Sequence, residues 1–167
     1  MRKIIVNGEL VSDHWITVHA NENGEITVPE NGDVLVALET WQANKDALVA
    51  HQGKTGLLLN GDAELEDFSA DLDKFDLIAV NFPKFADGRG YSLARLLRER
   101  VNYTGELRAV GDVLRDQLFY LHRCGFNAFV IREDRDVEDA LNAFKDFTVT
   151  YQADVHEERP IYHRRPA

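Results

Sequence analysis

Residues 81–117 read NFPKFADGRGYSLARLLRERVNYTGELRAVGDVLRDQ, and this stretch indicates a parallel α/β fold. The apolar run Leu77–Phe82 leads into it and ends at Pro83. A short loop with Asp87-Gly88-Arg89-Gly90 then precedes an amphipathic helix that we expect to begin near Ser92. The order of strand, short loop and helix N-terminus is the local arrangement with which α/β proteins hold anionic ligands.

The same alternation of β and α patterns runs along the chain. Apolar runs that predict strands lie at Val34–Leu38, Gly56–Leu59, Leu77–Phe82, Leu107–Gly111, Ala128–Arg132 and Thr148–Ala153. Helical patterns lie at Trp41–His51, Glu64–Lys74, Ser92–Val101, Val113–Cys124 and Val137–Phe147. We therefore expect an α/β fold of repeated β-α units with about six mostly parallel strands, because parallel neighbours need long crossovers. An open sheet and an incomplete (β/α) barrel both fit the pattern.

The two ends of the chain depart from this alternation. Lys3–Val6 and Trp15–His19 predict an antiparallel N-terminal β-hairpin, and Asn7-Gly8 supplies a turn that tolerates positive φ. We interpret residues 1–30 as an appendage built on this hairpin. Residues 156–167 show neither strand nor helix periodicity and are expected to form an extended C-terminal arm.

Length and composition favour a soluble single domain over residues 1–167. The sequence lacks the roughly 18 consecutive apolar residues of a membrane helix and the apolar core of a signal peptide, so we expect the cytoplasm. A formal net charge of -10 argues against binding to nucleic acid or to an anionic membrane. The one cysteine, Cys124, excludes an internal disulfide and any site built from several thiolates.

Polar residues follow the predicted strands, where ligands of parallel α/β proteins bind. Backbone N–H groups at a helix start and arginine side chains suit phosphate, sulfate, sulfite or a carboxylate. The candidate anion-binding residues are Lys84, Gly88, Arg89, Gly90, Ser92, Arg115 and Arg132. Asp112 and Glu133 are weak candidates for an acid or base, and the sequence leaves open whether the protein is catalytic.

Each of these residues also has a purely structural interpretation. Gly88 and Gly90 are compatible with a tight turn, and Ser92 and Asp112 with helix N-caps. Arg95 and Arg98 share a helix with Leu93, Leu96 and Leu97, which favours a solvated basic face. Whether residues 84–92 form a binding site or only a turn stays open at this point.

The sequence does not indicate a metal site or a resident cofactor. The six histidines show no HExxH or other close ligand spacing, and Gly88-Arg89-Gly90 matches neither the dinucleotide fingerprint nor the P-loop. A flavin or NADPH borrowed from another protein remains compatible with the chain.

Two runs carry a resemblance to a known family. FPKFADGRGYSLARLLRER and the following GELRAVGDVLRDQLFYLHRCGFNAF resemble the bacterial family Domain of Unknown Function nine-three-four (DUF934). Its members are typically encoded beside assimilatory sulfite reductase and are often labelled as oxidoreductases. The resemblance implies a place in sulfate assimilation and identifies no catalytic residue.

Three functions remain open. The first is an accessory protein that binds sulfite reductase or its electron donor and supports assembly or electron delivery. The second is a small enzyme or ligand-binding protein that holds a sulfur oxyanion or a phosphorylated cofactor at the loop of residues 84–92. The third is a structural homo-oligomeric module that associates through its sheet edge and its C-terminal arm.

Overall fold

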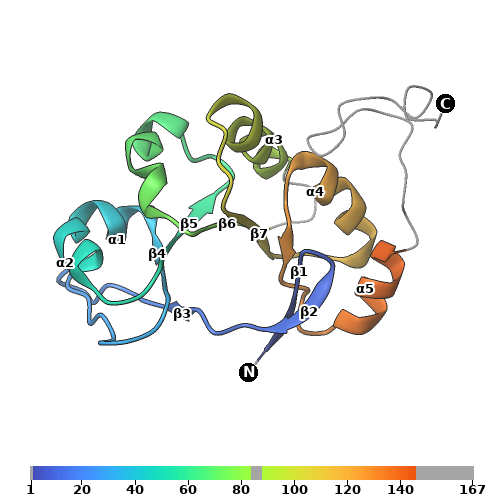
Figure 1. Cartoon of the computed structure of the whole chain (residues 1–167), viewed down its shortest axis with the longest axis horizontal. Coiled ribbons are helices and arrows are strands. Elements are labelled where there is room, and N and C mark those ends of the chain that lie inside the picture. The colour runs from blue at the N-terminus through green and yellow to red at the C-terminus, as the bar shows by residue number, and fades with distance from the viewer. Residues whose placement is uncertain (1, 84–87, 146–167) are drawn as a thin grey trace.

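The computed structural model describes residues 2–83 and 88–145, and these residues surround one sheet of eight strands (Figure 1). The strand order is β2-β1-β8-β7-β6-β5-β4-β3. The strands are β1 (Lys3–Val6), β2 (Glu9–Ser12), β3 (Ile16–Thr17), β4 (Val34–Ala37), β5 (Thr55–Asn60), β6 (Leu77–Phe82), β7 (Glu106–Gly111) and β8 (Ala128–Phe129). The fold is therefore mixed α/β, with eight strands where about six were expected.

Strands β3 to β8 pair in parallel, each with its neighbour along the chain. Five of the predicted strand runs overlap β4, β5, β6, β7 and β8, although β8 covers only the first two residues of the predicted run Ala128–Arg132. The run 148–153 lies outside the described residues. The prediction succeeds because strands buried on both faces have nearly continuous apolar sequences. The central pair β6 and β7 shows this, with Leu77–Phe82 almost entirely buried.

The N-terminal hairpin forms with a different partner from the one predicted. Asn7 and Gly8 adopt φ values of 51° and 80°, and this two-residue turn joins β1 directly to β2. Positive φ at both positions gives a turn whose twist matches paired strands. Residues 16–17, predicted to pair with β1, instead form β3 and pair in parallel with β4. The hairpin is also part of the sheet rather than an appendage, because β1 pairs antiparallel with β8.

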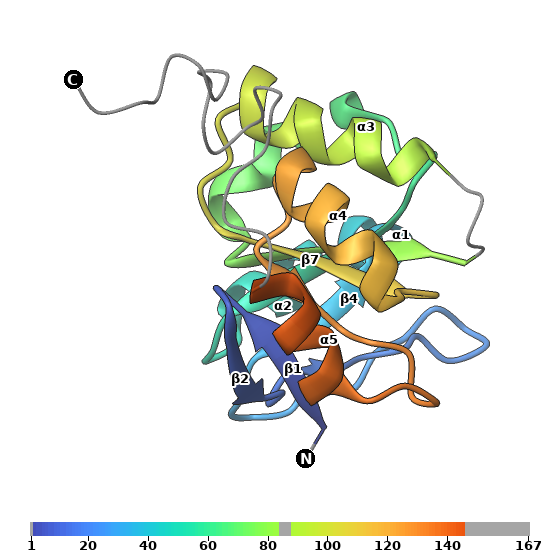
Figure 2. The same cartoon turned by 90° about the vertical axis from the view of Figure 1, so that its right-hand side faces the viewer.

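The helices cover the convex side of the sheet (Figures 1 and 2). They are α1 (Leu38–Ala43), α2 (Lys45–Ala50), α3 (Arg89–Arg95), α4 (Leu118–Cys124) and α5 (Val137–Lys145), with a π-helical turn at Leu96–Arg100 and 3₁₀ turns at Leu65–Asp67, Ser69–Lys74 and Arg115–Gln117. Right-handed crossovers between successive neighbouring strands place every helix on the same face. The predicted helix 41–51 is divided at Asn44, and 64–74 forms 3₁₀ turns in place of an α-helix.

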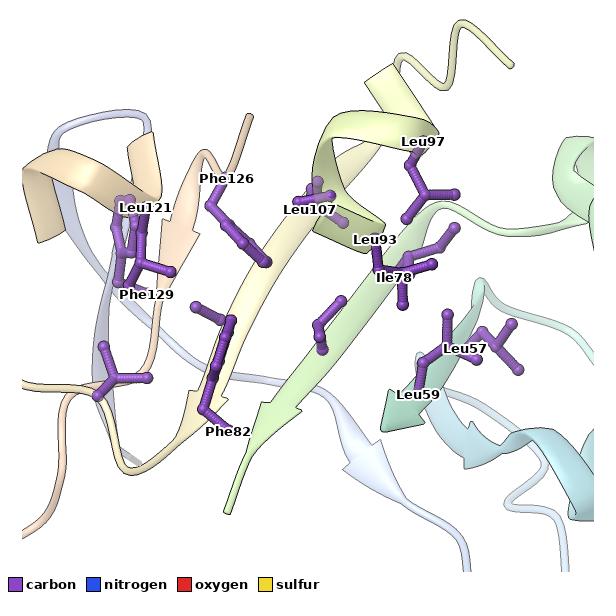
Figure 3. Close-up of a cluster of buried hydrophobic side chains, with 14 of the residues drawn as sticks. Leu57, Leu59, Ile78, Phe82, Leu93, Leu97, Leu107, Leu121, Phe126 and Phe129 are labelled. Carbon is purple, nitrogen blue, oxygen red and sulfur yellow. The ribbon is translucent and has the colours of Figure 1, made fainter. Parts of the chain in front are cut away.

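Side chains that point toward the helices form the main core. Along β6, Ile78, Val80 and Phe82 belong to this cluster, together with Leu57 and Leu59 of β5. Figure 3 shows how leucines and phenylalanines of the strands meet those of the helices above them. The alternate residues Leu77 and Ala79 belong to a second, smaller cluster on the other face, as the twofold periodicity of a strand requires.

The smaller cluster lies on the concave face and is covered by the N-terminal segment. Trp15 packs there against Leu35 and Leu77. Gly56 provides the space, since a methyl group at its Cα would lie 3.1 Å from the Trp15 ring and 3.1 Å from the Leu77 Cβ. The indole therefore fills part of the interior that a closed barrel would fill with strand side chains.

The sheet curls because one short segment connects its two edges. β2 ends at Ser12 and β3 begins at Ile16, although the two strands lie at opposite ends of the strand order. Four Cα steps span at most about 15 Å, whereas eight flat strands would extend about 33 Å. The sheet is thus a curled, incomplete barrel, which selects one of the two predicted architectures. Among the described residues, the structure contains no helix long and apolar enough to cross a membrane.

Candidate functional site

The concave face of the sheet contains an open hollow of about 640 Å³. Apolar side chains of β4, β5 and β7 form its floor, and charged side chains from the N-terminal segment, β7 and the loop after β8 surround them. The lining residues are Arg2, Asp13, Thr17, Leu35, Leu58, Arg108, Val110, Gly111, Val130, Arg132, Glu133 and Asp134. This is the face on which a barrel would hold its interior side chains.

Small side chains leave room in the middle of this face. Strand register aligns Ala37, Leu58, Ala79, Arg108 and Ala128 across five neighbouring strands. Three of these residues are alanines, so Leu58 and Arg108 have the only large side chains in the row. The row therefore combines one apolar and one cationic side chain over a low floor.

Arg108 is the most buried charged residue of the hollow, with 3% of its surface exposed. Its Nη2 lies 2.7 Å from Oε1 of Glu106, and its Nη1 lies 3.1 Å from Oδ1 of Asp13. A guanidinium buried to this degree needs such partners, because desolvation of an unpaired charge is very costly. Asp13 thereby fastens the segment that crosses the concave face to β7.

Arg132 forms a second cluster of the same kind at the rim of the hollow. Its Nη1 lies 2.8 Å from Oδ1 of Asp112, and its Nε and Nη2 donate to the two carboxylate oxygens of Asp134 at 2.6 and 2.8 Å. These bonds, first that to Asp134 and then that to Asp112, raise the pKa of Arg132. The pKa of Asp134 is lowered mainly by its hydrogen bonds from Arg132.

The two acid-base candidates are both next to an arginine. Asp112 accepts from Arg132, and Glu133 lies 3.6 Å from Arg2 with 86% of its side chain exposed. Arg2 also donates to the backbone oxygen of Ile131 at 2.6 Å. The interpretation of Asp112 as a helix N-cap is wrong, because the following helical turn begins at Arg115.

Arg115 lies in a separate, smaller hollow of about 300 Å³. Its Nη1 lies 2.7 Å from Oδ2 of Asp139 on α5, and this bond is the main cause of its raised pKa. Of the predicted anion-binding residues that the structure describes, Arg132 alone lines the larger hollow. The structure therefore does not bring Arg115 and Arg132 together on one ligand.

The loop of residues 84–92 is described only from Gly88 onward, so Lys84 lies outside the described residues. α3 begins at Arg89, three residues earlier than predicted, and Ser92 lies within the helix instead of capping it. Gly90 is buried, and a methyl group at its Cα would lie 2.5 Å from the Phe82 ring. Close packing of α3 on β6 therefore explains Gly90, whereas binding of an anion by this helix start stays a prediction.

Arg98 differs from its predicted position on a solvated face. Its Nε donates to the backbone oxygen of Gly125 at 2.9 Å, and its Nη1 donates to those of Tyr103 and Gly105 at 2.7 and 2.9 Å. Burial lowers the pKa of Arg98, with the Tyr103 phenol opposing that effect. Arg98 thus holds together loops that follow α3 and α4, while Arg95 pairs with Glu99 at 3.3 Å and also interacts with the Cys124 thiol.

Polar side chains at the ends of two further strands lie together, and the one cysteine belongs to the core. Asn60 and Asn81, at the carboxyl ends of β5 and β6, lie side by side with Nδ2 of Asn81 3.4 Å from Oδ1 of Asn60. Cys124 is fully buried, and burial raises the pKa of its thiol. Within residues 2–83 and 88–145, no three His, Cys, Asp or Glu side chains are placed to hold a metal ion.

Arg108 is not among the binding residues that the sequence predicts. The available signal is alternation. Leu107 and Ala109 point into the main core, so the residue between them must point to the concave face. A charged residue at such a position requires a buried partner or a ligand.

Comparisons with known proteins relate most of the concave site to one family. The model described as "Bacterial protein of unknown function (DUF934)" matches residues 56–162, which is more than half of the chain. The matched region includes Arg108 and Arg132 with Glu106, Asp112 and Asp134, whereas Arg2 and Asp13 precede it. A search of curated proteins gives no match.

Proposed function

The chain belongs to the bacterial DUF934 family, and from this membership we propose that it is an accessory protein of assimilatory sulfate and sulfite reduction. Its task is to bind sulfite reductase or the electron donor of that enzyme and to support assembly or electron delivery. The sulfur context comes from the resemblance of the run between Phe82 and Phe129 to proteins encoded beside sulfite reductase.

The observation that carries a binding role is the open, amphipathic hollow on the concave face. Leu35, Leu58 and Val110 provide apolar floor, and ion-paired side chains such as Arg132 and Asp134 surround it. Protein interfaces combine an apolar centre with a polar rim in this way. The arginines are already paired with carboxylates, so the rim suits a protein surface better than a free oxyanion.

Affinity capture tests this function directly. Tagged protein is expected to retain sulfite reductase or its electron donor from extracts of the source bacterium, and deletion of the gene is expected to lower sulfite reductase activity. Val110→Arg, at the floor of the hollow, should abolish capture. Val49→Arg is the matched control, because Val49 is 59% exposed on α2. Absence of capture together with unchanged reductase activity on deletion would refute the proposal.

A second candidate function is binding of a small ligand, in an enzyme or in a ligand-binding protein. A hollow of about 640 Å³ at a parallel sheet is within the usual size range of ligand pockets. Calorimetry with sulfite, sulfate, adenylyl sulfate, FMN and NADPH distinguishes this ligand-binding role from the accessory role. Binding that Arg89→Ala abolishes would favour the predicted loop, and failure of all five ligands would exclude this candidate.

A further inference from the structure

The charges around the concave site have an excess of carboxylates. Among the residues that the structure describes, five arginines and six carboxylates line the larger and smaller hollows, and Glu106 and Asp112 add two more carboxylates as partners of Arg108 and Arg132. Eight carboxylates thus face five guanidinium groups. Arginines that suggested an anion site in the sequence consequently lie in a region whose net charge is negative.

The arginine–carboxylate ion pairs explain why the excess negative charge is concentrated here. Arg108 lies between Asp13 and Glu106, and Arg132 lies between Asp112 and Asp134. Each cluster has two negative charges for one positive charge, and three guanidinium N–H groups of Arg132 are already directed at carboxylates. An incoming anion would have to displace these bonds, whereas an incoming cation finds unneutralised charge.

The acidic rim continues beyond the larger hollow. Asp134 lines the larger hollow, and Arg135 and Asp136, the next residues along the loop, line the smaller one. Asp116 and Asp139 also line that second hollow. One loop therefore contributes side chains to both hollows.

The floor fits the stem of a long basic side chain. Leu58 and Val110 are partly exposed in the hollow, and Glu133 and Asp134 are exposed at its edge. Lysine and arginine bury their methylene stems on apolar surface while the charged head stays at the polar edge. The arrangement of apolar floor and acidic edge matches that division of the side chain.

We infer that the larger hollow docks an extended basic segment of a partner protein, with lysine or arginine stems on the Leu58–Val110 floor and their cationic heads at the acidic rim. This inference rests on the proposed function and specifies the chemistry of the partner. Charge complementarity gives specificity and faster association, and it makes binding dependent on salt.

Fluorescence anisotropy with synthetic peptides tests the inference on the full-length protein. The probe is a labelled peptide of about ten residues that alternates lysine and leucine and spans roughly 35 Å when extended. The protein is expected to bind it at least about tenfold more tightly than the matching glutamate-leucine peptide, with affinity falling as salt is raised. Equal affinity for the two peptides would overturn the inference.

Variants that remove carboxylate charges show where the peptide binds. Glu133→Gln with Asp134→Asn should weaken binding of the lysine peptide by at least about fivefold. Glu66→Gln with Asp67→Asn is the matched control, because it removes the same charge from an exposed adjacent pair on a 3₁₀ turn. An equal loss in both double variants would show attraction by net charge alone and would overturn the site.

Other possible occupants of the hollow would give different results in these binding measurements. If spermine binds as tightly as the peptide, the site takes a small amine and not a protein segment. If the protein self-associates and the Glu133/Asp134 double variant abolishes this, a second copy of the chain occupies the site. Either result overturns the inference. If capture of the sulfur enzymes persists in that variant, the inference fails and the proposed function survives. If the peptide binds at the rim and those enzymes are never captured, the proposed function fails alone.

Discussion

Arg108 and Asp13 form an ion pair of 3.1 Å across 95 positions of the chain. Arg108 belongs to β7 in the centre of the sheet, and Asp13 lies in the segment that links the two sheet edges. The bond therefore connects the strand core to the connection that makes the sheet curl. Glu106 completes the cluster from the same strand at 2.7 Å.

Arg108→Met is expected to lower the free energy of unfolding by about 2–4 kcal/mol, because it leaves Asp13 and Glu106 without their shared cation. Urea denaturation measures the change. In a double-mutant cycle with Asp13→Ala, the double variant should lose less unfolding free energy than the sum of the two single losses, because both residues belong to one ion-pair network. Arg135→Met is the control, since Arg135 is 58% exposed and should change stability by less than about 0.5 kcal/mol. Equal effects at Arg108 and Arg135 would contradict the structural role.

Gly90→Ala is expected to destabilise the protein by about 1–3 kcal/mol, because its methyl group would meet the packed Phe82 ring. Gly88→Ala should change stability by less than about 0.5 kcal/mol, since no atom of the described residues lies within 4 Å of an added methyl group and the φ of Gly88 is -87°. Thermal unfolding of the two variants gives the comparison. A neutral Gly90→Ala would show that this glycine serves something other than packing of α3 on β6.

Arg98→Lys should cost about 1–3 kcal/mol, because an ammonium group does not reproduce the geometry of a guanidinium that binds three backbone oxygens. Arg95→Lys is the matched control one turn earlier, where a lysine can still pair with Glu99. Chemical denaturation of both proteins measures the difference. Similar stability of the two variants would place Arg98 on the solvated face that the sequence predicted.

The parallel strands were predictable because their signal is local. Leu77–Phe82 is apolar throughout, and this pattern requires no knowledge of neighbouring segments. The two-residue strand β3 has no comparable signal, and its partner β4 is selected by closure of the sheet. The sequence therefore predicted β-α units correctly and misassigned the partner of residues 15–19.

The site was harder to predict because its electrostatics depend on distant partners. Arg132 after a strand suggested an anion site, yet its partner Asp112 comes from the end of the neighbouring strand, twenty positions earlier. Arg108 depends on Asp13 in the same way. Ion pairs across the sheet change the net charge around an arginine, and a local sequence pattern does not show which distant residues form them.

Asp71 gives the fold a stability that should depend on pH. Its carboxylate accepts hydrogen bonds from Lys45, Lys74 and the Trp41 indole, with Oδ2 at 2.9 Å from Lys45 and Oδ1 at 2.9 Å from Lys74. These bonds, led by the one from Lys45, lower the pKa of Asp71 well below its ordinary value of 3.8. They connect α2 with the 3₁₀ turn Ser69–Lys74, and Asp71 itself is buried.

A lowered pKa in the folded state stabilises the fold at pH values above the ordinary pKa of 3.8. Below that pH the unfolded chain takes up a proton at Asp71 before the folded protein does, so this stabilisation declines as pH falls. Asp71→Asn should therefore cost about 1–3 kcal/mol at neutral pH, and its difference from wild type should narrow as acid is added. Urea denaturation across pH measures both, with the exposed neighbour Asp73→Asn as control. A difference that stays constant into acid would mean that the charge of Asp71 is not what stabilises this junction.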